Sequence, residues 1–432
     1  MRNPARRGCL ILFISIFLLA TSQSFAQSGN WMANTVLSLF QNAPWKLGTV
    51  RAYRQFTLGN AGYDSDIYYG YYDTHYPDAS FNAAPAFQWF VPLSKLVIFD
   101  SYQSLEGVFY FKNENERAFN FVTRNQVHFL SKKFYGKTGL NYSNVRQRFS
   151  PELLIHIRQE EISWDGLFLW QFSRSTAAAW QIRGARLNYR QPAYEGISID
   201  RELNRNEYYA DAFLYFQPGM RSRLFLNGQL GLYNFRYSES KFKDSHTYAV
   251  FGGLEFIPAL GSPRPVFEGN FNIGYMYLDL KNRQFKDASA LVGNGNILLN
   301  LSRWLSLQAY YSRDFSVSVY SSLLHYLQTT YGGGLRFTLS KRVTLGNDFA
   351  QGLSKYPLSQ EESLTGPEYR FTTMMANLGI RISRDWSLNI FGTFNQRKLL
   401  PEERKLKRYF IGFNLTFGSI PGENILPIPS LL

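Results

Sequence analysis

Apolar and polar residues alternate strictly from position 331 to position 340 of the chain. One face of an extended segment would carry Tyr331, Gly333, Leu335, Phe337 and Leu339. The other face would carry Gly332, Gly334, Arg336, Thr338 and Ser340. A period of two is typical of a β-strand with one apolar and one polar face. A cationic turn at Lys341 and Arg342 follows, and another alternating run begins after it. The pattern predicts a β-hairpin whose two faces contact different environments.

The same turn recurs along the chain. An aliphatic residue, a serine and one or two charged residues precede a new alternating strand at 301–307, 339–345 and 382–388. Consecutive turns lie about 40 residues apart, which leaves room for a strand of roughly ten residues, a longer loop and a return strand. Eight such turns, with both chain ends on the turn side, predict about eighteen strands, within a range of about sixteen to twenty.

The predicted fold is all-β: a transmembrane antiparallel up-and-down β-barrel with short periplasmic turns and longer extracellular loops. The longest loops are expected at 146–163, 191–206 and 354–367. Aromatic residues make up 17% of the chain, with 29 Tyr and 37 Phe, and aromatic girdles at two membrane interfaces would use that many rings. No segment after the N-terminus approaches the length of a helical span, so a membrane interpretation requires strands.

The chain begins with features of a secretory signal peptide. Arg2, Arg6 and Arg7 precede an apolar run, and Ser24-Phe25-Ala26 suits a small-x-small cleavage site. Residues 1–26 are therefore expected to be removed, together with the only cysteine, Cys9. The predicted organisation is a signal peptide at 1–26, a periplasmic lead-in at 27–45 that is either helical or unstructured, a barrel at 46–418 and a periplasmic tail at 419–432.

The formal charge of +14 falls to +11 once the three N-terminal arginines are removed. The remaining Lys and Arg residues form no nucleic-acid-binding motif, so no nucleic acid is expected as a partner. An exported protein meets lipid, lipopolysaccharide and acidic glycans instead. Cations in the turns and at the loop rims would account for part of the excess.

Charged residues within the predicted strands are assigned to the lumen, because charges on the lipid side are costly. The predicted pore-lining residues are Arg124, His128, Lys137, Arg158, Arg183, Arg336, Arg381, Asp100, Glu106, Asp211, Glu255 and Glu268, and the same argument places Glu160 inward. Two interpretations stay open. The charges form a conduit that attracts or screens a polar solute, or they form salt bridges across the lumen that hold the barrel in shape.

Two segments concern the closure of the barrel. Gly59 to Asp66 is predicted as either a bulge in one long strand or a turn between two strands. In the last strand Tyr409, Ile411, Phe413, Leu415 and Phe417 share one face. Gly412, Leu415 and Phe417 resemble the closing-strand signal of outer-membrane barrels, although Phe410 stands where a polar residue is usual.

The sequence offers little for catalysis or metal binding. The five histidines share no short ligand spacing, and the triple glycine at 332–334 is followed by no helix that would cradle a phosphate. An embedded Ser-His hydrolase is an alternative, but no Ser, His and acidic or amide residue fall on one recognisable strand. We predict no enzyme activity, no catalytic residue, no metal and no cofactor.

The Tyr63–Asp66 segment, the strand-turn units near Leu301, Leu339 and Ile382, and the closing strand resemble the putative β-barrel porin 2 family. The resemblance runs from about Lys46 to Phe417. It implies an outer-membrane barrel in a diderm bacterium, with some members associated with exopolysaccharide export. It also implies a partner in the periplasm, such as a polysaccharide-export protein. The barrel assembly machinery is a further expected partner.

The expected function is a channel that exports a polysaccharide, with inward Arg and Lys meeting acidic sugars and Tyr rings stacking on sugar faces. The alternatives are a general diffusion porin for small polar solutes, and a structural or adhesive barrel without transport.

Overall fold

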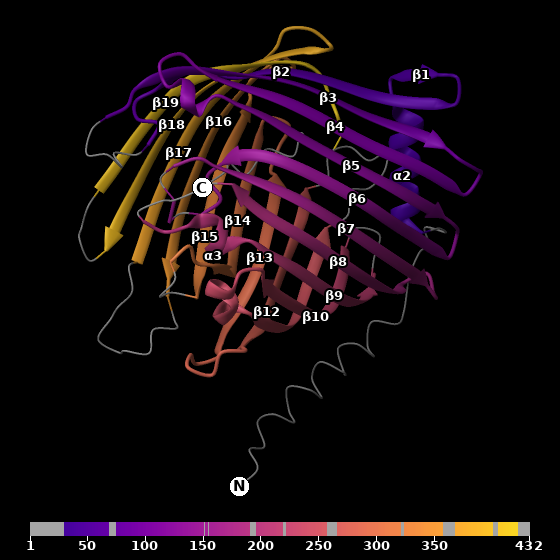
Figure 1. The fold of residues 1–432 in the computed structure, drawn as a ribbon. Helices are drawn as coiled ribbons and strands as arrows, with labels where there is room; N and C mark the ends of the chain where they lie inside the picture. Colours follow the sequence, from indigo (N-terminus) through magenta and orange to yellow (C-terminus); the bar gives the residue numbers. More distant parts are fainter. Residues whose placement is uncertain are drawn as a thin grey trace.

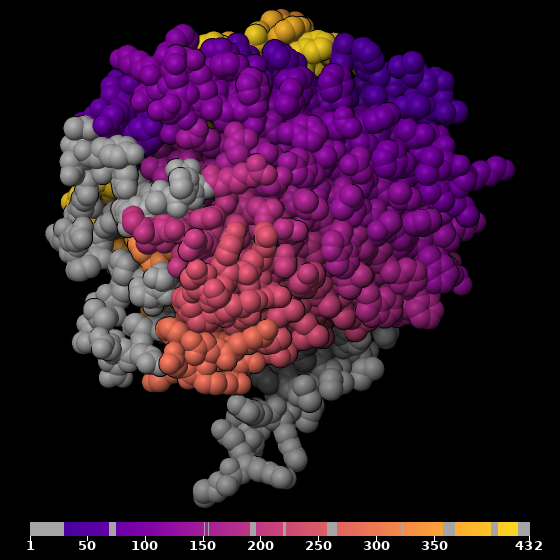
Figure 2. Space-filling model, viewed as in Figure 1, coloured from indigo at the N-terminus to yellow at the C-terminus, as the bar shows by residue number. Residues whose placement is uncertain are grey.

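Eighteen antiparallel strands form one closed barrel (Figure 1). The structure is a computed structural model that describes residues 30–68, 75–150, 152–153, 155–190, 196–218, 222–256, 266–320, 324–356, 368–400 and 405–421. The predicted signal peptide lies outside the described residues. Consecutive strands pair throughout, and the last strand pairs with the first barrel strand, so the sheet closes. In the space-filling view the outer surface runs in chain order from the indigo and purple strands through the magenta ones (Figure 2).

The strands of the first half of the barrel are β2 (Val50–Asp64), β3 (Asp78–Pro92), β4 (Val97–Tyr110), β5 (Ala118–Leu130), β6 (Phe134–Gln147), β7 (Ile157–Gln171), β8 (Thr176–Arg190), β9 (Arg205–Phe216) and β10 (Ser222–Phe235). Those of the second half are β11 (Ser245–Phe256), β12 (Phe267–Leu280), β13 (Ala288–Asn300), β14 (Leu305–Val317), β15 (His325–Thr338), β16 (Val343–Lys355), β17 (Glu368–Arg381), β18 (Trp386–Leu400) and β19 (Lys405–Gly418). The predicted strand number and architecture are confirmed.

Five short elements among the described residues accompany the barrel. Helix α2 (Trp31–Asn42) and strand β1 (Trp45–Leu47) precede it, and β1 pairs with the start of β2. Helix α3 (Ile199–Leu203) and the 3-10 helices η1 (Glu114–Glu116) and η2 (Ser238–Lys243) lie in the extracellular connections.

The alternation of side chains along each strand separates two environments. Outward residues are large and exposed on every side of the barrel, for example Trp89, Phe119, Trp164, Trp180, Ile273, Tyr331 and Ile411. Inward residues of the same strands are mostly polar or small. An exposed apolar outer face around a polar interior is the arrangement required of a barrel in a lipid bilayer.

The recurrent serine is explained by the turns. Ser340 Oγ accepts hydrogen bonds from the backbone N–H groups of Arg342 and Val343, both at 3.1 Å. Ser302 and Ser383 make the same two bonds in their own turns. A serine that satisfies two backbone donors stabilises a tight turn. The repeat seen in the sequence is therefore the chemistry of the short turns.

The Gly59 to Asp66 segment is a bulge within one strand. The pairing of β2 with β3 shifts register between Gly59 and Gly62, and Asn60 between them has a positive φ of 48°. A Cβ on Gly62 would lie 2.2 Å from the carbonyl oxygen of Ile411 on β19. The bulge thus lets β2 approach the closing strand closely.

The described start of the C-terminal tail turns into the lumen, so the expected periplasmic tail is corrected for these residues. Ile420 is 1% exposed and packs in the apolar cluster around α2, and its N–H donates to Gln55 Oε1 at 3.2 Å. Burial of Ile420 removes apolar surface from water, which a hanging tail would not do. Residues 422–432 lie outside the described chain.

Candidate functional site

The lumen is the candidate site, and its wall carries most of the predicted pore-lining charges. The residues on the inner face are Arg124, His128, Lys137, Arg183, Arg336, Arg381, Asp100, Glu106, Asp211, Glu255 and Glu268. In its strand, each of these residues lies an odd number of positions from the exposed apolar side chains, so it points to the opposite face, which is the inner one. Their role in lining a pore stays a prediction.

Arg158 is a correction. It lies four and six residues before Ile162 and Trp164, which are 43% and 41% exposed on the outer face, and therefore points outward with them. Glu160 shares this face and accepts a bond from Arg190 at 2.7 Å. Both residues sit at the extracellular end of β7, so their charges can reach water above the hydrocarbon. The assignment of all strand charges to the lumen fails at strand ends for this reason.

The inner charges pair between neighbouring strands. Lys137 on β6 lies 2.8 Å from Asp165 on β7, Arg183 on β8 lies 3.1 Å from Asp211 on β9, and Arg223 on β10 lies 2.9 Å from Glu255 on β11. His128 on β5 similarly faces Asp100 on β4 at 3.7 Å. These contacts run along the wall. These ion pairs therefore join neighbouring strands and do not cross the lumen, whereas one of the two interpretations expected salt bridges across it.

Helix α2 occupies the periplasmic mouth, inside the barrel wall (Figure 1). Asn30 caps its first turn, because Asn30 Oδ1 accepts from Met32 N and Ala33 N at 3.1 and 3.4 Å. Ala33 and Val36 are buried against the wall, and Tyr53 Oη donates to Leu39 O at 2.8 Å.

The anchor at the start of α2 is aromatic. The Arg223 guanidinium lies 3.4 Å from the ring centre of Trp31, and Tyr215 meets the same ring edge-on at 6.0 Å. The inward residues that receive the helix are apolar: Phe90, Ile98, Leu130, Leu169, Ala177 and Ala179. Together with Ile420, α2 closes part of the periplasmic mouth.

The connection between β6 and β7 spans the extracellular mouth. The connection runs from the end of β6 at Gln147 to the start of β7 at Ile157, so it is shorter than the predicted loop at 146–163. Its described residues are 148–150, 152–153 and 155–156. Ser150 Oγ lies 3.2 Å from Tyr326 Oη on β15, which is nine strands away in a ring of eighteen. Leu153 O accepts from Arg397 of β18 at 3.3 Å. The loop therefore reaches the opposite wall.

Glu152 fixes this extracellular closure. Its carboxylate accepts bonds from Ser318 Oγ and Val319 N, both at 2.7 Å, and from Tyr356 Oη. Burial raises the pKa of Glu152, and the bonds from Tyr356, Val319 and Ser318 oppose that rise. Nearby, Lys243 Nζ lies 2.7 Å from Glu202 and donates to Ser318 O, while burial lowers the pKa of Lys243.

A second cluster holds the same loop to η1. His156 Nδ1 lies 2.9 Å from Glu116 Oε2, and Arg146 lies 2.9 Å from Glu116 Oε1. Burial lowers the pKa of His156 to about 4, with Arg148 adding to the effect. Burial alone would raise the pKa of Glu116, but the hydrogen bond with His156 and the ion pair with Arg146 outweigh this and lower it. His156 is therefore neutral at pH 7 and donates a hydrogen bond.

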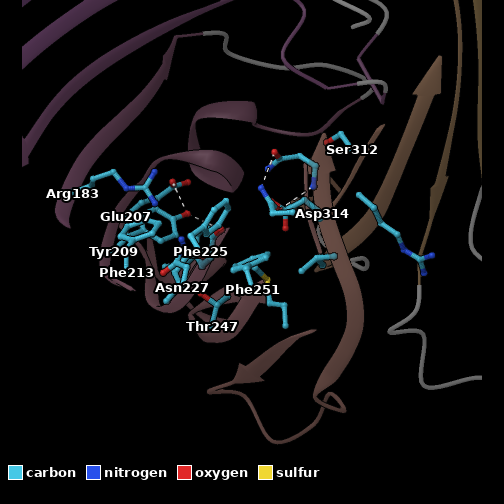
Figure 3. Close-up of a pocket in the computed structure, with 18 residues that line it drawn as sticks. Arg183, Glu207, Tyr209, Phe213, Phe225, Asn227, Thr247, Phe251, Ser312 and Asp314 are labelled. Atoms are coloured by element: carbon cyan, nitrogen blue, oxygen red, sulfur yellow. Dashed lines mark hydrogen bonds between the residues drawn. The ribbon is translucent and has the colours of Figure 1, made fainter. Parts of the chain in front are cut away.

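A cavity of about 500 Å³ lies in the lumen between the two closures (Figure 3). On one side β8 to β11 contribute Arg183, Glu207, Tyr209, Phe213, Phe225, Asn227, Thr247 and Phe251. Ser312 and Asp314 of β14 face them from the other side. Aromatic faces beside amides and hydroxyls suit an uncharged polyhydroxylated molecule, because the rings contact C–H faces while the polar groups bind hydroxyls. Sequence reasoning missed the cavity, since alternation predicts a face and gives no volume.

None of the described helices is long and apolar enough to cross a membrane. The closed barrel with an apolar exterior and a polar interior defines an outer-membrane porin-like protein.

The family model of putative beta-barrel porin 2 matches residues 177–397, just over half of the chain, and the chain belongs to this family.

Several solved structures are similar to this chain at low sequence identity. The siderophore receptor PirA from Pseudomonas aeruginosa is 11% identical with a TM-score of 0.42, covering 87% of this chain and 81% of that one. PirA from Acinetobacter baumannii is 7% identical with a TM-score of 0.43 and the same coverage. The copper transporter OprC is 10% identical with a TM-score of 0.43, covering 87% and 66%. No match was found among curated protein sequences.

Proposed function

We propose that this protein is a gated outer-membrane channel through which a polysaccharide chain is exported. The observation that carries the proposal is the polar lumen held between two closures, each made by a small element docked on the wall. Helix α2 is held at the periplasmic mouth by apolar packing of Ala33 and Val36, by the Tyr53 hydrogen bond and by the Arg223 guanidinium stacked on Trp31. The β6–β7 loop is held at the other mouth by Glu152. Small docked elements can leave without unfolding the barrel.

The proposed cargo is a neutral or weakly charged polysaccharide, which modifies the expectation of acidic sugars. Lys137, Arg183 and Arg223 each have an acidic partner on the next strand, so their charge is largely cancelled. What the wall then presents to a passing chain is tyrosine rings and amides, such as Tyr209, Asn227 and Gln229. Such groups bind hydroxyls and sugar faces without strong retention, as conduction requires.

Export requires a partner on the periplasmic side, and we propose a polysaccharide-export protein that contacts the short turns beside α2. Its arrival would displace the helix and couple opening to delivery of the chain. Support for the partner comes only from the position of α2 at that mouth.

A diffusion porin for small polar solutes is the second candidate, favoured by the paired charges, which leave a wall of low selectivity. It differs from the first candidate in its response to polymer. A structural or adhesive barrel without transport would keep both closures permanently in place.

Conductance in planar bilayers tests these alternatives. Removal of residues 30–43 is expected to raise the open probability at least tenfold over the intact chain, while Asn34→Ala on the exposed face of α2 should leave it unchanged. Added neutral polysaccharide should then block the current in discrete events. An open pore indifferent to polymer would favour the porin, and a variant that stays closed would contradict both channel proposals.

Secretion gives an independent test in the producing cell. A strain lacking the gene is expected to retain polysaccharide that the parent exports, and restoration of the gene should restore export. Normal secretion by the deletion strain would remove the export proposal while leaving a channel for other solutes possible.

A further inference from the structure

The ladder between β13 and β14 stops partway along the wall. Pairing runs from Asn300 with Ser306 to Gly293 with Arg313. Both strands continue beyond this point, β13 through 288–292 and β14 through 314–317, without pairing to each other. Within the described strands, no other neighbouring pair leaves so long a facing stretch unpaired. The wall is split here over its extracellular part.

The split is confined to this seam. In the same stretch β13 remains paired with β12 as far as Ala288, and β14 remains paired with β15 as far as Val317. The strands on either side are therefore intact, and the missing ladder is a local feature of one junction. Unpaired sheet edges do not face lipid in the hydrocarbon region, because their backbone groups would lack partners. The exposed apolar side chain of Leu291 borders the split, so we take this part of the seam to face the apolar belt, where it needs a cover.

Phe315 is placed to fill the split. Phe315 lies four residues after Tyr311 on β14, so alternation places both on the same face. Tyr311 pairs with Tyr331 of β15, which is 46% exposed, so this face is the outer one. Phe315 itself is only 9% exposed and belongs to an apolar cluster with the inward residues Leu278 and Val292. Across the seam, Leu291 remains 57% exposed. An outward residue packed with inward ones fits a side chain that lies in the gap between the two strands.

The lumen cavity reaches the split. Val292 and Gly293 of β13 and Ser312, Arg313 and Asp314 of β14 line it, and these are the residues at the point where the ladder ends. Figure 3 shows Ser312 and Asp314 facing the aromatic side of the cavity, where Phe225 and Phe251 lie. The seam is therefore the stretch of wall between the cavity and the outer surface.

Four buried polar atoms of the residues that line the cavity have no hydrogen-bond partner among the described residues. They are Thr247 Oγ1, Asn227 Oδ1, Arg183 Nε and Arg313 Nε. Buried polar atoms are normally satisfied, so these four point to a missing partner. The amide oxygen only accepts hydrogen bonds and the arginine N–H groups only donate them, so the ligand needs both donors and acceptors, which hydroxyl groups supply. Phe213, Phe251 and Met276 beside them would contact an apolar chain.

The charges around the cavity limit the ligand further. The lining holds two arginines, Arg183 and Arg313, and two acidic residues, Glu207 and Asp314, so its formal charges sum to zero. The ion pairs of Arg183 and Glu207 are made with Asp211 and Arg205. A strongly anionic headgroup would find no excess of cations there. An uncharged head with hydroxyl groups fits both the unpartnered oxygens and the charge balance.

We propose that the split between β13 and β14 is a lateral portal, closed by Phe315, through which an amphipathic ligand with an uncharged hydroxyl-bearing head and an acyl chain passes between the outer leaflet and the cavity. This site is separate from axial transport of a polymer. It gives the barrel a second route, perpendicular to the first.

Engineered disulfides test the portal, because Cys9 is the only cysteine in the chain and lies in the predicted signal peptide. Continuing the register of Gly293 with Arg313 places Leu291 opposite Phe315. The variant Leu291→Cys/Phe315→Cys should lock the seam when oxidised. The matched control is Phe315→Cys/Leu327→Cys, which joins two directly paired residues of β14 and β15 and loses the same phenylalanine.

The probe is a monoacylglycerol with a photoreactive diazirine in its acyl chain, supplied in vesicles that contain the protein. In the reduced variants we expect labelling of the peptides that carry Phe213 and Phe251. Oxidation should reduce that labelling at least tenfold in the 291–315 variant and leave the 315–327 control unchanged. Thr247→Val, without any lock, should reduce labelling several-fold through loss of the hydroxyl.

Each other result has a defined meaning. Absence of cavity labelling in the unlocked protein, or equal labelling in the locked and control variants, would overturn the portal. A 291–291 disulfide dimer would also overturn it, since it would indicate that a second copy covers the seam. If the 291–315 pair does not oxidise, a bifunctional thiol reagent spans the same positions and provides the lock. Axial conductance should be equal in all these variants, which separates failure of the portal from failure of the proposed channel.

Discussion

Single side chains in this barrel act on backbone groups and on charges that the strands bring together. The turn serines satisfy donors that the hairpin itself leaves free, and the paired wall charges are satisfied by the neighbouring strand. Both kinds of residue can be recognised from sequence as types at given positions. Their partners depend on register, which alternation alone does not supply.

Replacement of Ser340 by alanine tests the turn. Two backbone N–H groups lose their acceptor, and we expect a loss of about 1 kcal/mol in unfolding free energy, in line with loss of a cap. Urea unfolding in detergent micelles measures the change. Ser340→Asp keeps an acceptor oxygen and should stay close to the parent protein. Equal losses in the two variants would show that the hydroxyl bonds are not the cause.

The His156 contact predicts a dependence on pH. Its pKa is lowered to about 4 in the folded loop from about 6.5 when unfolded, so the unfolded loop binds the proton more tightly. The contribution of His156 to the stability of the closure is therefore fully present above about pH 6.5. It falls as the pH drops toward 4, and the free energy of opening decreases by about 2 kcal/mol between pH 7 and pH 5. Protease cleavage of the β6–β7 loop should rise over that interval.

The variant His156→Gln separates this contribution from the carboxylates. Glu116, with a lowered pKa, titrates below the interval, whereas the raised pKa of Glu152 acts in the opposite direction. The difference between the parent and His156→Gln reports the histidine alone. If both proteins show the same pH dependence of cleavage, the histidine has no part in the closure.

Two elements, α2 and the β6–β7 loop, narrow the two mouths of the barrel. Spacing of Trp31, Val36 and Phe40 indicated a helix at most, and its docking inside the mouth was not predicted. The reason is that Phe90, Ile98 and Leu169 break the polar rule on the inner face, and only the closed ring brings them together as one apolar surface. The loop was likewise predicted as long and extracellular, but its reach across the lumen depends on residues nine strands away.

The stacked contact at Trp31 is expected to hold α2 in place. Trp31→Ala removes the ring that lies under the Arg223 guanidinium. A desolvated cation–π contact of this kind stabilises by about 1–2 kcal/mol, so its loss should raise the open probability roughly tenfold. Trp31→Phe keeps a ring and should give an intermediate value. Single-channel recording provides the measurement. An unchanged open probability in Trp31→Ala would place the anchor elsewhere on the helix.

At the scale of the whole molecule, the barrel depends on the junction of its first and last strands. The architecture and number of strands followed from the alternation and the spacing of turns, because both are local. The split at β13–β14 did not follow, because the unpaired residues there alternate like any others. The pattern of the last strand indicates that β19 closes the barrel. For the segment around Asn60 the sequence allows a bulge or a turn, and only the register of β2 with β3 decides between them.

Asp64 and Arg408 hold that junction. Arg408 Nε lies 2.9 Å from both carboxylate oxygens of Asp64, which is 1% exposed. Arg408→Ala leaves a buried carboxylate and should reduce unfolding free energy by about 3 kcal/mol. The double variant Asp64→Asn/Arg408→Gln should lose less than the single one, because no charge is stranded. Heat-modified migration on gels and urea titration measure both, and an equal or larger loss in the double variant would contradict this assignment.

The orientation of the wall ion pairs affects how the protein responds to its surroundings. Since each pair links adjacent strands, a solute advancing along the axis has no bridge to break, and the ring keeps its shape whether it is occupied or empty. Arg223, which contacts both Glu255 and the Trp31 ring, is shared by the ring and the helix. If α2 leaves, the pair with Glu255 keeps that arginine on the wall, so the barrel holds ready the place to which the helix returns.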